Sequence, residues 1–189
     1  FSAVRLNSRL RPAPEVRGEL PVATMAEEID TEGQGHVRAL VTIAPHPALS
    51  APNADRLDKA FSSLAFMVSV DPYLNETTRH ADVVLPPPSV LERSHFDLSF
   101  TSLAVRNFAN YSPVVFEPTS ISEPDILARL ALALNRADSD VKPSVVHDML
   151  LRGLIEREVA SERSVISGRD PEEIFAAVAD RPPCFARLH

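Results

Sequence analysis

Apolar residues divide the first part of the chain into helix-like and strand-like segments. Apolar positions at helical spacing predict a short amphipathic helix over residues 22–29, which a glycine-containing turn ends near Gly35. The run 37–44 is nearly continuous in apolar residues and rich in β-branched ones, as in a strand buried on both faces. A buried helical segment is the alternative, but the glycine before the run and the prolines after it favour the strand. The residues at helical spacing are Val22, Met25, Ala26 and Ile29.

The next segments repeat this rhythm. Apolar positions at helical spacing predict a helix that begins after Asn53, which is well placed as its N-cap. Apolar runs at 65–70 and 83–85 predict two more strands, and a short polar segment at 75–80 lies between them. Strands that alternate with helices predict an α/β fold, a three-layer sandwich with a mostly parallel sheet and right-handed connections.

The second half of the chain is predicted to be mainly helical. Ser122 opens a capping-box-like sequence that predicts a helix to about Ala133. Asp170 followed by proline is a strong helix start, and apolar positions predict another helix around residues 145–154. Alternating apolar residues between 89 and 120 leave a hairpin and an extended loop as the two interpretations. The fold class is therefore α/β with a C-terminal helical segment.

Charge and composition exclude several classes of function. The net charge of −7 argues against a nucleic-acid partner, because phosphate binding is driven by clustered lysine and arginine. No apolar run is long enough to predict a membrane segment. The single cysteine, Cys184, can neither form an internal disulfide nor complete a four-cysteine cluster, which suits a cytoplasmic location. The sequence begins at Phe1 rather than at methionine, so we expect a portion of a longer protein.

Candidate chemistry lies where the predicted strands end, since open parallel sheets bind ligands beyond the carboxyl ends of their strands. Loop 45–52 follows the first strand and leads to a helix N-terminus, where backbone N–H groups favour phosphate and Ser50 adds a hydroxyl. Asp71 directly follows the second strand and can accept hydrogen bonds from a ribose or a guanine edge. Segment 77–82 is a candidate pocket wall. Without a glycine-rich motif, nucleotide binding and an ordinary turn at Asp71 both stay open.

One segment carries a more specific motif. The run 77–86, TTRHADVVLP, resembles a landmark of the molybdopterin oxidoreductase family, the group that contains dimethyl sulfoxide reductase, formate dehydrogenases and nitrate reductases. The resemblance covers roughly residues 18–135, and the remaining landmarks agree in order and spacing. These landmarks are Val37 to Leu40, Pro47, Ser50, Val70 and Asp71, Glu76 and Glu92.

The resemblance implies an α/β domain that holds one half of a bis(molybdopterin guanine dinucleotide) cofactor carrying molybdenum or tungsten. It implies that the first loop meets phosphates or guanosine, that Asp71 lies near the guanine, and that Thr77 and Asp82 shape the pocket wall. The family has Gly-x-Asn-Pro, or a close variant, where this chain has APHP at 44–47, so the backbone freedom of the glycine is lost. The implied cofactor-binding residues are His46, Ser50, Val70, Asp71, Thr77 and Asp82.

Two functional hypotheses follow. In the first, the chain is the cofactor-orienting portion of an oxidoreductase, whose metal ligand and any iron–sulfur cysteines lie outside these residues, and its partner is the remainder of the same polypeptide. In the second, it is a non-catalytic α/β module for assembly or for another nucleotide, with a degenerate cofactor loop. The predicted organisation is an irregular strap at 1–20, a Rossmann-like cofactor-binding domain at 21–136 and a helical tail at 137–189.

Overall fold

A computed structural model describes residues 7–16, 18–96, 103–106, 110–138 and 140–179. The chain forms two compact units, residues 1–87 and 88–189, which are described separately. The predicted cofactor-binding segment, 21–136, extends across both units. Cys184 lies outside the described residues.

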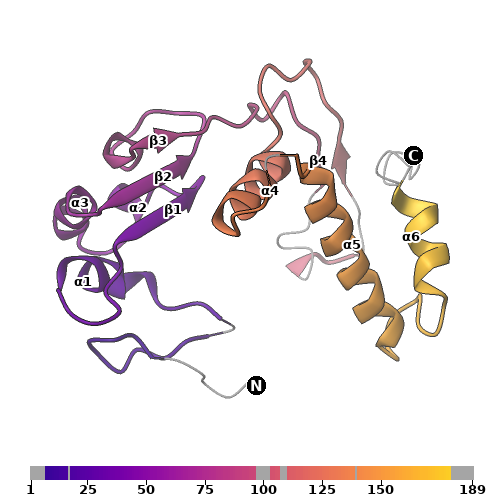
Figure 1. The fold of residues 1–189 in the computed structure, drawn as a ribbon, viewed down its shortest axis with the longest axis horizontal. Coiled ribbons are helices and arrows are strands. Elements are labelled where there is room, and N and C mark those ends of the chain that lie inside the picture. The colour runs from indigo at the N-terminus through magenta and orange to yellow at the C-terminus, as the bar shows by residue number, and fades with distance from the viewer. Residues whose placement is uncertain (1–6, 17, 97–102, 107–109, 139, 180–189) are drawn as a thin grey trace. The chain divides into compact units, whose positions relative to one another are not determined.

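The first unit is built on three parallel strands in the order β1-β2-β3 (Figure 1). Val41 of β1 pairs with Val68 of β2, which pairs in turn with Val83 of β3. This sheet confirms the predicted α/β class and the parallel arrangement, and the three predicted strands are all present. The strands are β1 (Ala39–Ile43), β2 (Phe66–Val70) and β3 (Val83–Val84).

Helices α1 and α3 pack together over one face of this sheet and form the hydrophobic core. Ile29 of α1 and Phe61 of α3 are almost wholly buried, and Leu40 of β1 packs against them. The predicted helices near 22–29 and after Asn53 are confirmed, although the Asn53 side chain makes no capping hydrogen bond. The helical elements of the unit are η1 (Val22–Thr24), α1 (Met25–Asp30), α2 (Pro47–Ser50), α3 (Ala54–Ser62) and η2 (Thr78–His80).

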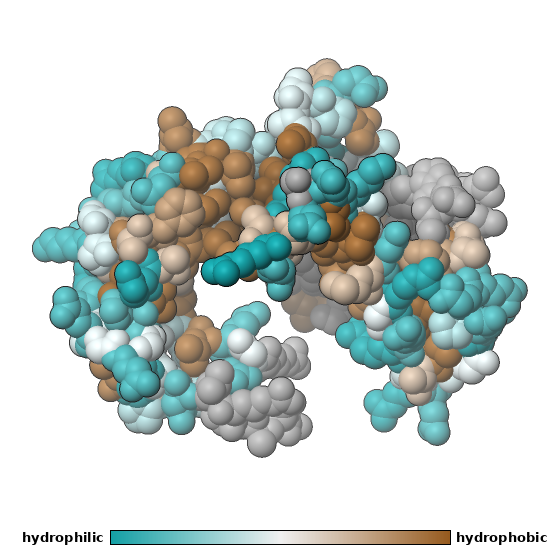
Figure 2. Space-filling model, viewed as in Figure 1, coloured by the Kyte–Doolittle hydropathy of each residue, from teal (hydrophilic) through white to brown (hydrophobic). Residues whose placement is uncertain are grey.

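Alternation along the strands places a second set of apolar side chains on the opposite face of the sheet. Val41 and Ile43 of β1 are each 44% exposed, and Phe66 of β2 is 47% exposed. Figure 2 shows apolar side chains gathered over the strands of this unit. The prediction of a strand buried on both faces at 37–44 is therefore wrong for β1 in this structure, because α1 and α3 cover only the face that carries Leu40.

The described residues of the second unit form a short antiparallel pair and three helices. His95 pairs with Ser112 and Phe96 with Tyr111. The predicted alternation lies largely at 97–102, outside the described residues, so the choice between a hairpin and an extended loop stays a prediction. Helix α5 packs against both α4 and α6. None of the described helices is long and apolar enough to cross a membrane. The elements are β4 (His95–Phe96), β5 (Tyr111–Ser112), α4 (Glu123–Leu134), α5 (Pro143–Ala160) and α6 (Pro171–Ala179).

The predicted helix starts of the second unit are confirmed at the level of single hydrogen bonds. Ser122 Oγ accepts from the backbone N–H of Asp125 at 3.3 Å, as an N-cap serine does. Asp170 Oδ1 accepts from the backbone N–H of Glu172 at 3.0 Å. Local sequence therefore sets where α4 and α6 begin.

Candidate functional site

The carboxyl ends of β1 and β2 carry two loops that lie side by side. We call residues 44–53 the first loop and residues 71–77 the second loop. Ile43 pairs with Val70, and the Ala44 N–H donates to the Val70 carbonyl at 2.8 Å, which joins the two loops where they begin. The parallel register thus brings together five of the six predicted cofactor-binding residues, at the edge of the sheet where open α/β folds bind ligands.

Ala44 adopts a left-handed backbone conformation at the start of the first loop. Its φ is 57°, a region that costs an L-residue about 1–2 kcal/mol and that glycine enters freely. The family pattern has glycine at this position. A glycine at this position would adopt the same φ without the steric cost of the alanine Cβ.

His46 connects the two loops through both of its ring nitrogens. Its Nε2 lies 2.9 Å from Glu76 Oε2, and its Nδ1 lies 3.4 Å from Thr77 Oγ1. The Thr77 hydroxyl also accepts from the backbone N–H of Ala48 at 3.1 Å. Thr77 is 0% exposed, so the hydroxyl is fixed among these partners.

The donors that were expected to meet phosphate are used within the first loop. The backbone N–H groups of Leu49 and Ser50 donate to the His46 carbonyl, and Ser50 Oγ donates to the same oxygen at 3.0 Å. Pro47 has no N–H, and the Ala48 N–H is taken by Thr77. Helix α2 is also only four residues long. In this conformation the first loop therefore offers little to an anion.

Asp71 is the most buried charged group of the second loop, at 6% exposed. Its Oδ1 accepts from the backbone N–H of Tyr73 at 2.8 Å, and its Oδ2 accepts from Asn75 Nδ2 at 3.1 Å. Two ionised carboxylate oxygens provide about four acceptor positions, of which these bonds use two. Asp71 is held in one orientation and keeps acceptor capacity for a ligand.

Asn75 and Thr78 fix the shape of the second loop. Asn75 Oδ1 accepts from the backbone N–H groups of Thr77 and Thr78, at 2.9 and 3.0 Å. Thr78 Oγ1 in turn accepts from the Asn75 N–H at 2.8 Å and is 1% exposed as a residue. Side chains that bond to nearby backbone groups replace secondary structure here. These hydrogen bonds fix the backbone of the second loop and thereby the positions of Asp71 and Thr77.

Asp82 lies at the opposite end of the sheet from the other predicted site residues. It precedes β3, and its Oδ2 accepts from the backbone N–H of Met67 at 2.7 Å, near the start of β2. Asp71 follows the end of β2, four residues beyond Met67, which corresponds to about 13 Å along a strand. The structure therefore gives Asp82 a role in joining β3 to β2.

The charge at the two loops is negative. Asp71 and Glu76 contribute carboxylates, and the pKa of Glu76 is lowered, first by its own backbone N–H and then by His46. The nearby cation, Arg79, donates to Asp58 Oδ1 at 2.5 Å and faces α3. No group of three or more histidine, cysteine, aspartate or glutamate side chains in the described part of the chain could hold a metal ion.

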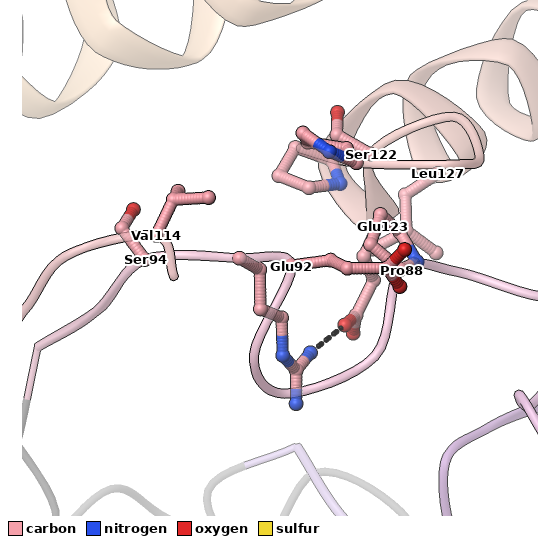
Figure 3. A pocket seen from close by; sticks show the side chains of 10 residues that line it. Pro88, Glu92, Ser94, Val114, Ser122, Glu123 and Leu127 are labelled. Carbon is pink, nitrogen blue, oxygen red and sulfur yellow. Dashed lines mark hydrogen bonds and ion pairs between the residues drawn. The ribbon is translucent and has the colours of Figure 1, made fainter. Parts of the chain in front are cut away.

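The second unit contains a pocket that the sequence did not predict. It has a volume of about 470 Å³, and half of its lining residues are proline or aliphatic, while the other half are polar or charged, Glu92 and Ser94 among them (Figure 3). Arg93 and Glu123 form an ion pair at 2.6 Å within its lining. Glu92 accepts from the Ser89 N–H and from Thr119 Oγ1, at 2.9 and 2.7 Å. Only the landmark position of Glu92 could have drawn attention to this region.

Comparison with known proteins agrees with the motif at 77–86. The chain is 38% identical over 66 residues to the assimilatory nitrate reductase catalytic subunit of Bacillus subtilis. It is 37% identical over 79 residues to the F420-dependent formate dehydrogenase subunit alpha of Methanocaldococcus jannaschii. The chain is thus similar to parts of proteins of the molybdopterin oxidoreductase family.

These similarities cover only part of each protein. The nitrate reductase match takes in 35% of this chain and 9% of the relative, and the formate dehydrogenase match takes in 42% and 11%. The "Probable oxidoreductase YyaE" of Bacillus subtilis is 24% identical over 102 residues, which is 54% of this chain and 15% of the relative. The chain thus spans about a tenth of the length of these relatives. A scan of family profiles finds none that matches the chain.

Proposed function

We propose that this chain is the portion of a molybdopterin-dependent oxidoreductase that binds and orients the guanosine end of a bis(molybdopterin guanine dinucleotide) cofactor. The observation that carries the proposal is Asp71, a buried and oriented carboxylate at the carboxyl end of a central parallel strand. The similarity to this family supports a cofactor of this class, and the position fits the general rule for ligand sites in open α/β sheets.

Asp71 suits a guanine edge in particular. A guanine presents neighbouring N–H donors, which two oxygens of one carboxylate can accept together. Tyr73 and Asn75 each occupy one acceptor position and set the plane of the carboxylate. In this proposal Val70 supports Asp71 from the strand, and Thr77 holds the wall opposite.

The negative charge of the site favours the neutral base over the pyrophosphate. Asp71 and Glu76 repel phosphate oxygens, and the donors of His46 and Ser50 are engaged within the loops. His46 and Ser50 then contact the nucleoside, and the phosphates are bound by groups beyond these two loops. Asp82 is left out of the proposed site because it lies at the amino end of the strands.

The cofactor supplies the redox chemistry, and this chain supplies binding and orientation. The residues of the described part of the chain that would hold it are His46, Ser50, Val70, Asp71 and Thr77. The metal ligand and the electron partner belong to the remainder of the same polypeptide or to another protein.

The test is a binding measurement with guanosine, which carries no phosphate, on the full chain by isothermal titration calorimetry. Asp71→Asn replaces one acceptor oxygen by a donor amide, and we expect the affinity to fall by about ten- to a hundredfold. Asp82→Asn is the matched control, because Asn can still accept from the Met67 N–H, and its affinity should equal that of the wild type. Equal affinities for Asp71→Asn and the wild type would refute the role of Asp71.

A second function is favoured by one observation, the internal use of the donors in the first loop. In that case the chain is a non-catalytic nucleotide-binding or assembly module. Metal analysis and pterin fluorescence of the full-length protein separate the two proposals. Molybdenum or tungsten together with pterin supports the oxidoreductase, and the absence of both supports the module.

A further inference from the structure

Glu76 lies at the rim of the proposed site and faces a ring nitrogen of His46. The two residues are thirty positions apart in the sequence, and their contact joins the first loop to the second. The His46 side chain is 27% exposed, whereas the Glu76 side chain is 63% exposed. An ion pair this exposed contributes little to the stability of the fold. Its effect is to fix the position of the His46 ring relative to the second loop.

The surrounding hydrogen bonds determine which nitrogen of His46 carries the proton. Thr77 Oγ1 accepts from the Ala48 N–H, so its own hydrogen is available to donate to His46 Nδ1. The Nδ1 atom is then an acceptor, and in the neutral ring the proton lies on Nε2. The Nε2–H donates to Glu76 Oε2, the only partner of that nitrogen among the contacts of the described residues.

We propose that Glu76 is a positioning residue for the site, which holds His46 as its Nε2–H tautomer and thereby keeps the first loop against the second. The expected effect of Glu76 on ligand binding rests on the proposed function. The order of donors is Ala48 N–H to Thr77, Thr77 O–H to His46, and His46 N–H to Glu76. Without the last acceptor, the ring can rotate or change tautomer, and the Thr77 hydroxyl loses its fixed direction.

The experiment uses the full chain labelled with ¹⁵N, and long-range ¹H–¹⁵N spectra of the histidine rings at alkaline pH, where histidine is neutral. His46→Gln assigns the signal of His46. Glu76→Ala removes the acceptor, Glu76→Gln keeps an acceptor oxygen without the charge, and Glu32→Ala is the control at another exposed glutamate of the first unit. Each variant is also titrated with guanosine, which carries no phosphate.

The expected result is an Nε2–H tautomer in the wild type, in Glu76→Gln and in Glu32→Ala, and a mixture of tautomers in Glu76→Ala. Guanosine should bind to Glu76→Ala about two- to tenfold more weakly, the effect of one hydrogen bond. An unchanged tautomer or an unchanged affinity in Glu76→Ala overturns the positioning role. If the wild type does not bind guanosine, the proposed function fails, and the tautomer of Glu76→Ala alone decides whether Glu76 positions His46.

Discussion

Replacing Ala44 by glycine removes a steric conflict at the first turn of the site. Ala44 has a φ of 57°, where the Cβ of an L-residue approaches its own backbone, and glycine has no Cβ. The residue is exposed, so the substitution opens no cavity in the core. Its N–H donates to the Val70 carbonyl in either case, because the backbone bond does not depend on the side chain.

Two opposing effects determine how much Ala44→Gly changes the free energy of unfolding. Relief of the left-handed strain is worth about 1–2 kcal/mol. Glycine makes the unfolded chain more flexible, which lowers stability by about 0.4–1 kcal/mol. We therefore expect Ala44→Gly to raise the free energy of unfolding by roughly 0.5–1 kcal/mol, the balance of the two effects.

Urea denaturation followed by circular dichroism measures this difference. With a slope of about 1–3 kcal/mol per molar urea, the midpoint should rise by roughly 0.2–1 M at an unchanged slope. Ala81→Gly is the matched control, because Ala81 has a φ of −76° and a ψ of 134°, where alanine is unstrained. That variant should lower the midpoint, since it adds flexibility to the unfolded chain without relieving strain.

Comparison of the two glycine variants shows whether Ala44 is strained. If Ala44→Gly and Ala81→Gly both destabilise the chain by a similar amount, Ala44 carries no left-handed strain in solution. The altered glycine position would then have no structural cost, and the first loop would differ in conformation from the one described.

Two further changes test other parts of the first unit. Glu28 is 8% exposed; burial raises its pKa, but the hydrogen bonds from Ser8 and from Arg9 outweigh this, so that its pKa lies below the ordinary 4.5. Glu28→Gln should lower the free energy of unfolding at neutral pH by about 1.5–3 kcal/mol. The difference between the variant and the wild type should shrink as the pH falls below 4.5 towards the lowered pKa of Glu28. A difference that does not depend on pH would contradict this. Thr77→Val removes the acceptor of the Ala48 N–H and should lower the free energy of unfolding by about 1–3 kcal/mol, whereas Thr77→Ser should keep most of the stability. Hydrogen exchange at the Ala48 amide measures whether the bond is present. Equal exchange rates in both variants would refute the bond.

The sequence by itself determined the regular elements and the position of one candidate site residue. Periodic apolar positions, prolines and capping residues act over a few neighbours, so the three strands, α1, α3, and the starts of α4 and α6 were predictable. Asp71 was predictable for the same reason, because it directly follows an apolar run whose carboxyl end had to face the ligand edge. The motif at 77–86 indicated the resemblance to the molybdopterin oxidoreductase family without any structure.

Only the tertiary structure decided how residues from separate segments meet. The parallel register of β2 and β3 placed Asp82 at the amino end of the sheet, and no local pattern encodes that register. The packing of α1 and α3 on one face left Val41 and Ile43 exposed, although their run looked buried on both sides. The His46–Glu76 contact spans thirty residues and depends on two loops whose backbone bonds satisfy each other first. Long-range hydrogen bonds form only when the chain has closed these loops, which is why their partners could not be read along the sequence.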